Sequence, residues 1–247
     1  MPLGLLGKKL GQTRVYDAQG VSHSVTIVLA GPNRVLQCKT RQTDGYDAVQ
    51  LGFGDQKDHR LSKAELGHLK KFGVDTRRAD EKTPLVLSGA RRIREFRNFS
   101  KPVKAGDVVG PNLFAVGDFV DAIGVTKGRG FEGVVKRHGF RGGDSTHGAK
   151  GFHRRSGAIG QRLFPGTVMR GMKMPGHMGQ VTRTVQNLEI MQVREVDNLL
   201  LIKGAIPGAN GDYVVIREAK KMPKGTVKHK PGAETKGKGG PKVAIKK

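Results

Sequence analysis

The segment from residue 136 to residue 180 restricts the fold more than any other part of the chain. It holds eleven glycines in 45 residues, and its apolar side chains follow neither helical spacing nor strand alternation. Because it has neither apolar pattern, this segment cannot supply a hydrophobic core of its own. A loop of this length is unusual in a compact domain unless it is functional or a partner orders it. The remaining residues must therefore provide the folded body.

The positive charge of the chain is concentrated in two segments. Residues 127–183 contain twelve Lys and Arg against two acids, Glu132 and Asp144, and residues 220–247 contain ten Lys against Glu234. Together these segments carry 19 of the 24 net positive charges, so the rest has the balance of an ordinary globular protein. Such an excess indicates a polyanionic partner.

Short β-type runs separated by turn signals predict the body. They favour a β-barrel or a β-sandwich and cover residues 24–30, 34–39, 46–53, 118–126, 181–196, 199–203 and 213–217. Ser62 and Glu65 have capping-box spacing, which predicts one short helix with Gly73 at its end. The arginines at positions 91, 92 and 94 are read first as a solvated strand edge and second as an RNA contact.

Several sequence features indicate an intracellular, cytoplasmic protein. The single cysteine, Cys38, excludes an internal disulfide, and the apolar run before Lys8 is too short for a signal-peptide core. No run reaches the roughly 18 apolar residues of a membrane span. An acidic membrane surface is another polyanion to consider, but no amphipathic basic helix is visible. We expect the Lys-rich tail to be disordered when free and to add nonspecific affinity.

The composition of residues 136–180 suits RNA. Glycine allows close backbone approach, and arginine adds bidentate phosphate contacts and base stacking. A hairpin with about 20 residues in each arm reaches at most roughly 65–70 Å, at about 3.3 Å per residue. Four of the seven methionines, Met169, Met172, Met174 and Met178, fall within ten residues. Glycine and proline interrupt them, which favours flexible apolar packing against RNA or neighbouring loops.

Other functions fit the sequence less well. Gly128, Gly130 and Gly133 match G-x-G-x-x-G, but no helix is expected after them, and no acid stands about 20 residues on for a ribose. Asp144, Ser145 and His147 lack a nucleophile elbow, and the histidines at 138, 147, 153 and 177 lack metal-site spacing. A DNA-compacting protein would suit the tail but has no use for a long glycine loop inside a barrel. We therefore expect no enzyme activity, cofactor, metal or small-molecule substrate.

Specific residues give the chain a family resemblance over about residues 3–217. A signature-like set comprises Phe114, Asp121, Gly124, Thr126, Gly128, Arg129, Gly130, Gly133 and Arg137. Matching segments occur at residues 4–14, 146–148, 165–166, 173–179 and 203–208. In these positions the sequence resembles bacterial members of the universal large-subunit ribosomal protein three family.

The resemblance implies a mainly β fold with minor α structure, a translation-protein-like β-barrel with a small α/β insertion and a long glycine-rich basic extension. The expected parts are a barrel body at 1–54, 105–135 and 181–217, an inserted region at 55–104, an rRNA-penetrating extension at 136–180 and a tail at 218–247. The family binds the 3′-terminal part of large-subunit rRNA and acts early in assembly. Its extension points toward the peptidyl-transferase centre, and it contacts large-subunit proteins fourteen and nineteen.

Carried over by position, the tip of the extension is expected at residues 157–166. In some bacterial relatives a glutamine near this tip is methylated; the aligned position here is Leu163, which leaves Gln161 as the nearby candidate. The residues expected to bind rRNA are Lys127, Arg129, Lys136, Arg137, Arg141, His147, Lys150, His153, Arg154, Arg155, Gln161, Arg162, Arg170, Lys173 and His177.

Overall fold

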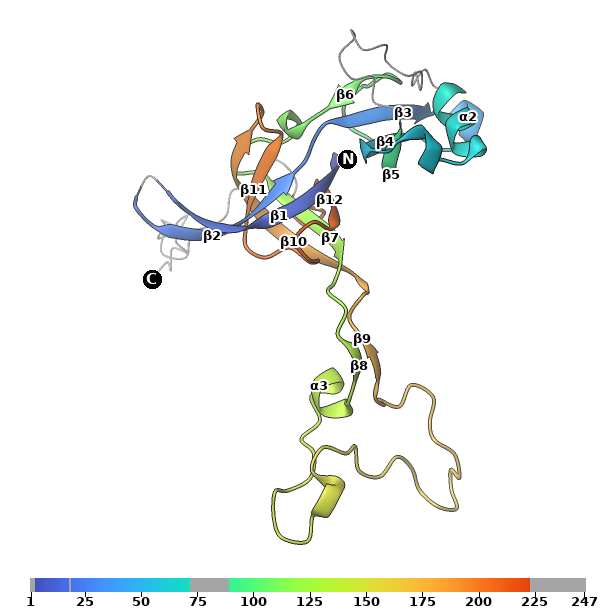
Figure 1. The fold of residues 1–247 in the computed structure, drawn as a ribbon, viewed down its shortest axis with the longest axis vertical. Coiled ribbons are helices and arrows are strands. Elements are labelled where there is room, and N and C mark those ends of the chain that lie inside the picture. The colour runs from blue at the N-terminus through green and yellow to red at the C-terminus, as the bar shows by residue number, and fades with distance from the viewer. Residues whose placement is uncertain (1–2, 18, 72–88, 223–247) are drawn as a thin grey trace, which may run out of the picture.

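The computed structural model describes residues 3–17, 19–71 and 89–222, and its centre is a closed antiparallel β-barrel (Figure 1). Around the barrel the strand order is β1-β12-β7-β10-β11-β2. The strands are β1 (Gly4–Tyr16), β2 (Ser22–Leu29), β7 (Phe119–Val125), β10 (Thr182–Arg194), β11 (Leu199–Lys203) and β12 (Tyr213–Glu218). The mainly β class and the barrel are thus confirmed, as are the predicted strands at β2, β7, β10, β11 and β12.

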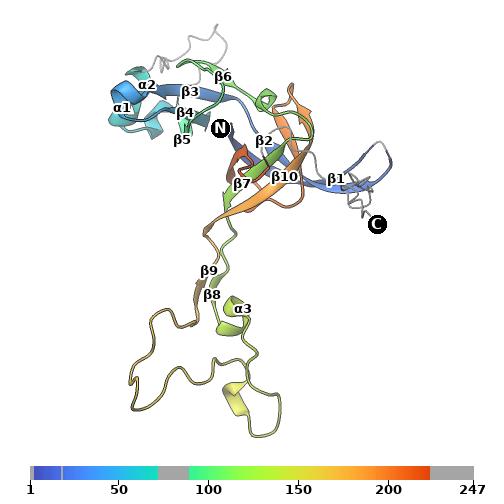
Figure 2. The ribbon, with the colours of Figure 1, turned by 180° about the vertical axis from the view of Figure 1, so that it is seen from behind.

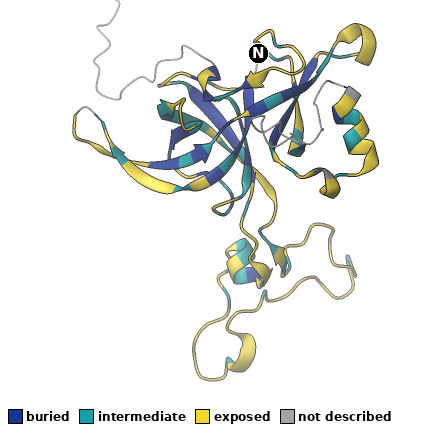
Figure 3. Cartoon of the chain, turned by 45° about the horizontal axis from the view of Figure 1, so that its top comes forward, coloured by how far each residue is buried: buried dark blue, intermediate teal, exposed yellow. Residues whose placement is uncertain are grey.

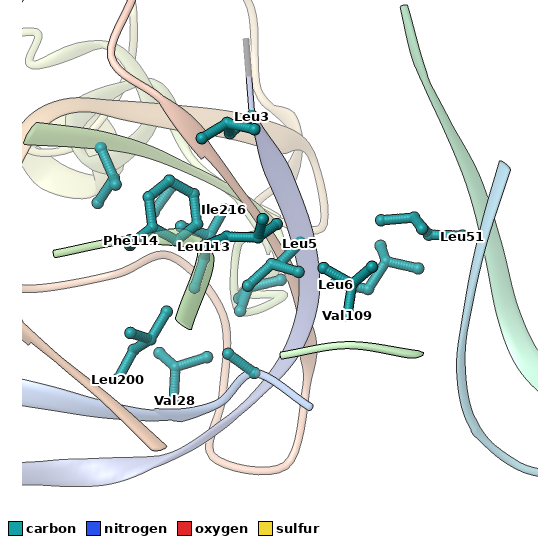
Figure 4. Packing of buried hydrophobic residues seen from close by; sticks show 14 of the residues in the cluster. Leu3, Leu5, Leu6, Val28, Leu51, Val109, Leu113, Phe114, Leu200 and Ile216 are labelled. Atoms are coloured by element: carbon teal, nitrogen blue, oxygen red, sulfur yellow. The ribbon is translucent and has the colours of Figure 1, made fainter. Parts of the chain in front are cut away.

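Alternating side chains fill the barrel because successive residues of a strand point to opposite faces. Leu5, Val28, Leu200 and Ile216 come from four different strands, and all are fully buried. Figure 4 shows these side chains close together inside the barrel. Burial is concentrated in the barrel and the neighbouring sheet, whereas the long projection below them is largely exposed (Figure 3). The core therefore lies in the body, as the composition required.

A second sheet of four strands packs beside the barrel, in the order β5-β4-β3-β6. Its strands are β3 (Asn33–Lys39), β4 (Ala48–Asp55), β5 (Ala90–Arg97) and β6 (Val108–Val109). Leu51, Phe53 and Phe96 of this sheet share one buried cluster with Leu5 and Leu6 of the barrel. The two sheets thus form one continuous core.

This second sheet corrects part of the sequence interpretation. Residues 1–54 were assigned to the barrel, but β3 and β4 pair with β5 and β6 instead. Pro32, between β2 and β3, has no N–H to donate to a ladder, so the chain leaves the barrel there. The strand containing Arg91, Arg92 and Arg94 is β5, at one edge of this sheet, so the predicted strand edge is present, and this position is also open to an RNA contact.

The helices are short. They comprise α1 (Arg41–Asp44), α2 (Lys63–Lys71) and α3 (Val134–His138), with 3₁₀ turns at Asp58–Arg60, Pro111–Leu113 and Lys150–Phe152. The predicted capping box of α2 is present: the Ser62 N–H donates to Glu65 Oε2 at 2.8 Å, and the Glu65 N–H donates to Ser62 Oγ at 3.3 Å. The Ser62 N–H and the Ser62 hydroxyl both donate to the Glu65 carboxylate, and they hold the pKa of Glu65 below its usual value. Gly73 and the tail from residue 223 lie outside the described residues.

Asn33 connects the two sheets. Its fully buried amide accepts a hydrogen bond from the Leu6 N–H at 3.1 Å. The same amide donates to the carbonyls of Leu6 and Ala30, each at 3.0 Å. The barrel strand β1 is thereby fixed to the first residue of β3.

Replacing Asn33 with alanine is expected to lower the free energy of unfolding by about 3 kcal/mol, because it leaves three buried backbone groups without partners. Urea unfolding followed by circular dichroism measures this effect. Asn210→Ala, at an exposed turn position, is the matched control and should change stability by less than about 0.5 kcal/mol. Equal stability of the two variants would show that the Asn33 bonds do not join the sheets.

Candidate nucleic-acid interface

Two adjacent barrel strands, β7 and β10, continue beyond the barrel as a narrow stem (Figures 1 and 2). Their ladder ends with Val125 opposite Thr182. The Thr126 N–H then donates to the Val181 carbonyl at 3.0 Å, and the Arg129 N–H donates to the Met178 carbonyl at 2.9 Å. The projection therefore begins at residue 126 and returns at residue 181.

The stem includes a short antiparallel pair, β8 (Gly130–Glu132) with β9 (Gly176–Met178). This pair lies outside the barrel to which residues 105–135 were assigned, so the expected start of the extension at residue 136 was too late. Beyond the stem the two arms separate and follow irregular paths (Figure 1). The long paired hairpin considered from the sequence is thus limited to its root. We call residues 126–181 the extension from here on.

Gly179 lets the two arms of the stem come together. Its φ is +80°, a conformation that side chains rarely adopt. A Cβ at this position would collide with the Lys127 carbonyl oxygen and lie 3.0 Å from the Gly128 Cα. Only glycine fits at this crossing.

Helix α3 follows Gly133 directly, which corrects the expectation that no helix follows the G-x-G-x-x-G match. The helix has five residues and ends at Gly139, whose φ is +74°. The strand before it, β8, pairs antiparallel with β9. A dinucleotide site needs a βαβ unit with a parallel strand, and the stem does not have one.

Arg137 and His138 tie α3 to the returning arm. Arg137 Nη1 donates to the Met174 carbonyl at 2.7 Å, and His138 Nε2 lies 3.0 Å from the same oxygen. These contacts leave Arg137 half-buried. It is the one predicted rRNA-binding residue that is not exposed, so part of its role is to hold the extension together.

A tight loop occupies the middle of the extension. The Gly143 N–H donates to the His153 carbonyl at 3.0 Å, and His153 Nδ1 lies 3.2 Å from the Asp144 carbonyl oxygen. A Cβ at Gly143 would lie 2.9 Å from the Phe152 carbonyl. The guanidinium of Arg155 lies over the Phe152 ring, with Cζ 4.5 Å from its centroid. Glycine at position 143 thus allows two backbone segments of the extension to approach each other closely, a contact that the sequence did not predict.

The other fourteen predicted site residues are exposed. Among the described residues, one of them forms an ion pair: Lys136 Nζ lies 3.1 Å from Glu132 Oε1. The remaining positive charges of the extension face solvent without a carboxylate. Such an array attracts a polyanion, and its spread along two arms suits a long ligand better than a point-like one.

Large apolar side chains are exposed beside these charges. Leu163 and Phe164, at the expected tip, are 90% and 91% exposed, and Phe131 on the stem is 77% exposed. Met169 and Met172 are exposed too. The sequence interpretation included the methionines of the extension but did not include its exposed aromatic rings. An aromatic residue inside a glycine-rich segment that has no core to bury it would have predicted an exposed ring.

Catalytic and metal-binding arrangements find no support in the part of the chain that the structure describes. Asp144, Ser145 and His147 are all exposed. Within the described ranges, no group of three or more His, Cys, Asp or Glu side chains is placed to hold a metal. Nor does any helix within these ranges have the length and apolar character to cross a membrane.

Comparison with known proteins agrees with this architecture. A family model described as "Ribosomal protein L3" matches residues 95–198. The large ribosomal subunit protein uL3 of Pseudomonas fluorescens SBW25 is 44% identical over 221 residues, covering 90% of this chain and 99% of the relative. That of Deinococcus radiodurans is 46% identical over 218 residues, covering 88% and 95%.

These matches define the class of the molecule as ribosomal protein. Within that class, the chain belongs to the ribosomal protein L3 family.

Proposed function

We propose that this protein is a structural constituent of the large ribosomal subunit that binds the large-subunit rRNA through its extension and catalyses no reaction. One observation carries the proposal: the exposed cations of residues 126–181 have almost no carboxylate partners and no core beneath them. Its relatives are named as large ribosomal subunit proteins, which supports the large subunit as the assembly in which the extension would bind RNA.

The proposed mechanism is architectural. The barrel and second sheet form a rigid anchor, and the extension becomes ordered as RNA packs around it, with phosphate contacts offsetting the ordering cost. Glycine positions admit RNA backbone close to the polypeptide, whereas Arg154, Arg155 and Arg162 offer phosphate contacts and planar surfaces for bases. The exposed rings of Phe131 and Phe164 would be covered by bases or apolar groups of the particle.

Finer parts of the proposal follow from the family. We place the contact in the 3′-terminal part of the rRNA and the tip, residues 157–166, toward the peptidyl-transferase centre. The protein acts early in subunit assembly, in the cytoplasm, beside large-subunit proteins fourteen and nineteen. Gln161, which is exposed, is accessible for methylation.

A salt titration tests the electrostatic basis. If about six cations contact phosphates, the plot of log affinity for large-subunit rRNA against log salt concentration should have a slope of roughly −4 to −5. Filter binding of the full chain between low and physiological salt measures it. A slope near zero would contradict the proposal.

The main alternative is a nucleotide-dependent enzyme, suggested by Gly128, Gly130 and Gly133. That function predicts saturable binding of a dinucleotide by the free protein, measurable by calorimetry. We expect no such binding, because the antiparallel stem does not present a helix N-terminus of the required kind to a pyrophosphate.

A further inference from the structure

A groove of about 620 Å³ lies where the barrel, the second sheet and the root of the extension meet. Strands β7 and β12 provide its floor, with Val125 and Tyr213 among the lining residues. Arg92 and Arg94 of β5 line one side, and Lys127 and Gln180 at the root of the extension line another. The groove therefore brings together three parts of the chain that are distant in sequence.

The alternation of β5 explains why two of its arginines reach the groove. Arg92, Arg94 and Phe96 lie on one face of the strand because side chains alternate. On the neighbouring strand Phe53 and Leu51, opposite Arg92 and Arg94, are buried in the core between the sheets. This face of β5 thus points toward the barrel, and its two arginines lie at the border of the core, where they line the groove. Arg97 lies on the opposite face of the same strand and contacts the Tyr46 ring, whereas Arg91, at the start of the strand, lies over the Tyr213 ring with Cζ 5.8 Å from its centroid.

The positive charge in the groove is not neutralised from within. Among the described residues, no carboxylate forms an ion pair with Arg92, Arg94 or Lys127, and Asp212 is the one acid in the lining. The Asp212 carboxylate is engaged with the Ala209 N–H at 2.6 Å. Burial and the nearby Lys127 ammonium lower the pKa of Lys9, and Asp212 opposes this only in part.

Tyr213 gives the groove an aromatic wall. The guanidinium of Arg92 lies over its ring, with Cζ 5.2 Å from the centroid. The Phe53 ring packs edge-on against the Tyr213 ring, with 6.0 Å between the two ring centroids. A stacked guanidinium keeps its N–H groups in its own plane, where they can donate to phosphate oxygens.

We propose that this groove binds a phosphodiester segment of RNA, held between Arg92 and Arg94 on one side and Lys127 on the other. The inference rests on the proposed function and extends it from the extension to the body. RNA is favoured over an acidic protein segment because one wall is the root of the extension, so an RNA strand following the stem continues into the groove. Binding here would fix the direction in which the extension leaves the barrel.

The test compares two double variants with the same change in charge. Arg92→Glu/Arg94→Glu alters the groove face, whereas Arg41→Glu/Arg97→Glu changes two exposed arginines that do not line the groove and is the matched control. Each pair also removes one arginine contact with a tyrosine ring, that of Arg92 with Tyr213 or that of Arg97 with Tyr46. We expect the groove variant to reduce the magnitude of the salt-dependence slope for rRNA binding by about 1.5, or roughly 0.7 to 0.9 for each lost phosphate contact, and the control to change it little.

An equal reduction of the salt-dependence slope in the two variants would overturn the proposal of RNA binding in the groove but would leave the proposed function standing. Failure of the unmodified chain to bind rRNA would overturn both. A photo-crosslinking residue in place of Val125, which is exposed and lines the groove, identifies the occupant in assembled subunits. Crosslinks to RNA support the inference, whereas crosslinks to protein alone contradict it. Unchanged circular dichroism of both double variants ensures that folding does not explain the difference.

Discussion

Replacement of residues 144–172 by a short Gly-Ser linker is expected to leave the body folded and to weaken rRNA binding by roughly two orders of magnitude or more. None of the replaced residues is buried, so the core loses nothing. The replacement removes five cations: Lys150, Arg154, Arg155, Arg162 and Arg170. It keeps α3 and the Met174 carbonyl that Arg137 contacts. Thermal unfolding and rRNA binding, measured on the same preparation, separate the two effects.

A full-length variant with the same five cations changed to glutamine distinguishes charge from shape. It should lose most of the salt dependence that the replacement loses, because glutamine releases no counterions from phosphate. Neither variant is expected to shift the melting temperature by more than about 2 °C, since surface changes away from packed contacts cost little. Full rRNA affinity of the linker variant would show that the body alone binds.

Gly179→Val is expected to disrupt the root of the extension and to impair incorporation into large subunits about as severely as the linker replacement. Valine disfavours a φ of +80°, and its Cβ would collide with the Lys127 carbonyl. The stem must therefore open, and the arms no longer leave the barrel in a fixed direction. Complementation of a strain depleted of its own protein, followed by subunit profiles, measures the effect.

Gly171→Val is the matched control, because Gly171 has the same φ of +80° but nothing within 4 Å of an added Cβ. Both variants carry the local strain of a β-branched residue in the left-handed region, and only Gly179→Val also carries the collision. Subunit levels should be much higher for Gly171→Val. Equal subunit levels for the two variants would show that the close approach of the two arms at Gly179 is not needed for incorporation into the large subunit.

The sequence predicted the strands whose apolar residues follow a clear pattern, such as β11, where Leu200 and Ile202 are buried. It did not predict β1, because glycines and lysines stand where a strand normally carries apolar residues. Tertiary contacts explain them: a Cβ at Gly4 would collide with the Phe96 ring, and Lys9 Nζ donates to the carbonyls of Ile206 and Gly208 at 2.8 and 3.0 Å. Such positions depend on partners far away in the sequence.

The candidate site shows the same division. Charge and glycine content predicted where most of the extension lies and which of its side chains are cationic, because those properties belong to single residues. They could not reveal that Gly130–Glu132 pairs with Gly176–Met178, since no apolar pattern marks this contact. Nor did they separate Arg137, whose half-buried guanidinium donates to the Met174 carbonyl, from exposed arginines such as Arg154 and Arg162.

Association with the large subunit tests the central claim most directly. The full chain carries an affinity tag and is expressed in place of the host's own protein, and cell extracts are fractionated on sucrose gradients. We predict that nearly all of the chain sediments with large subunits and whole ribosomes, and that the linker variant accumulates near the top of the gradient or in incomplete particles. A full chain that stays at the top, or that sediments with nucleoid DNA instead, would contradict the account.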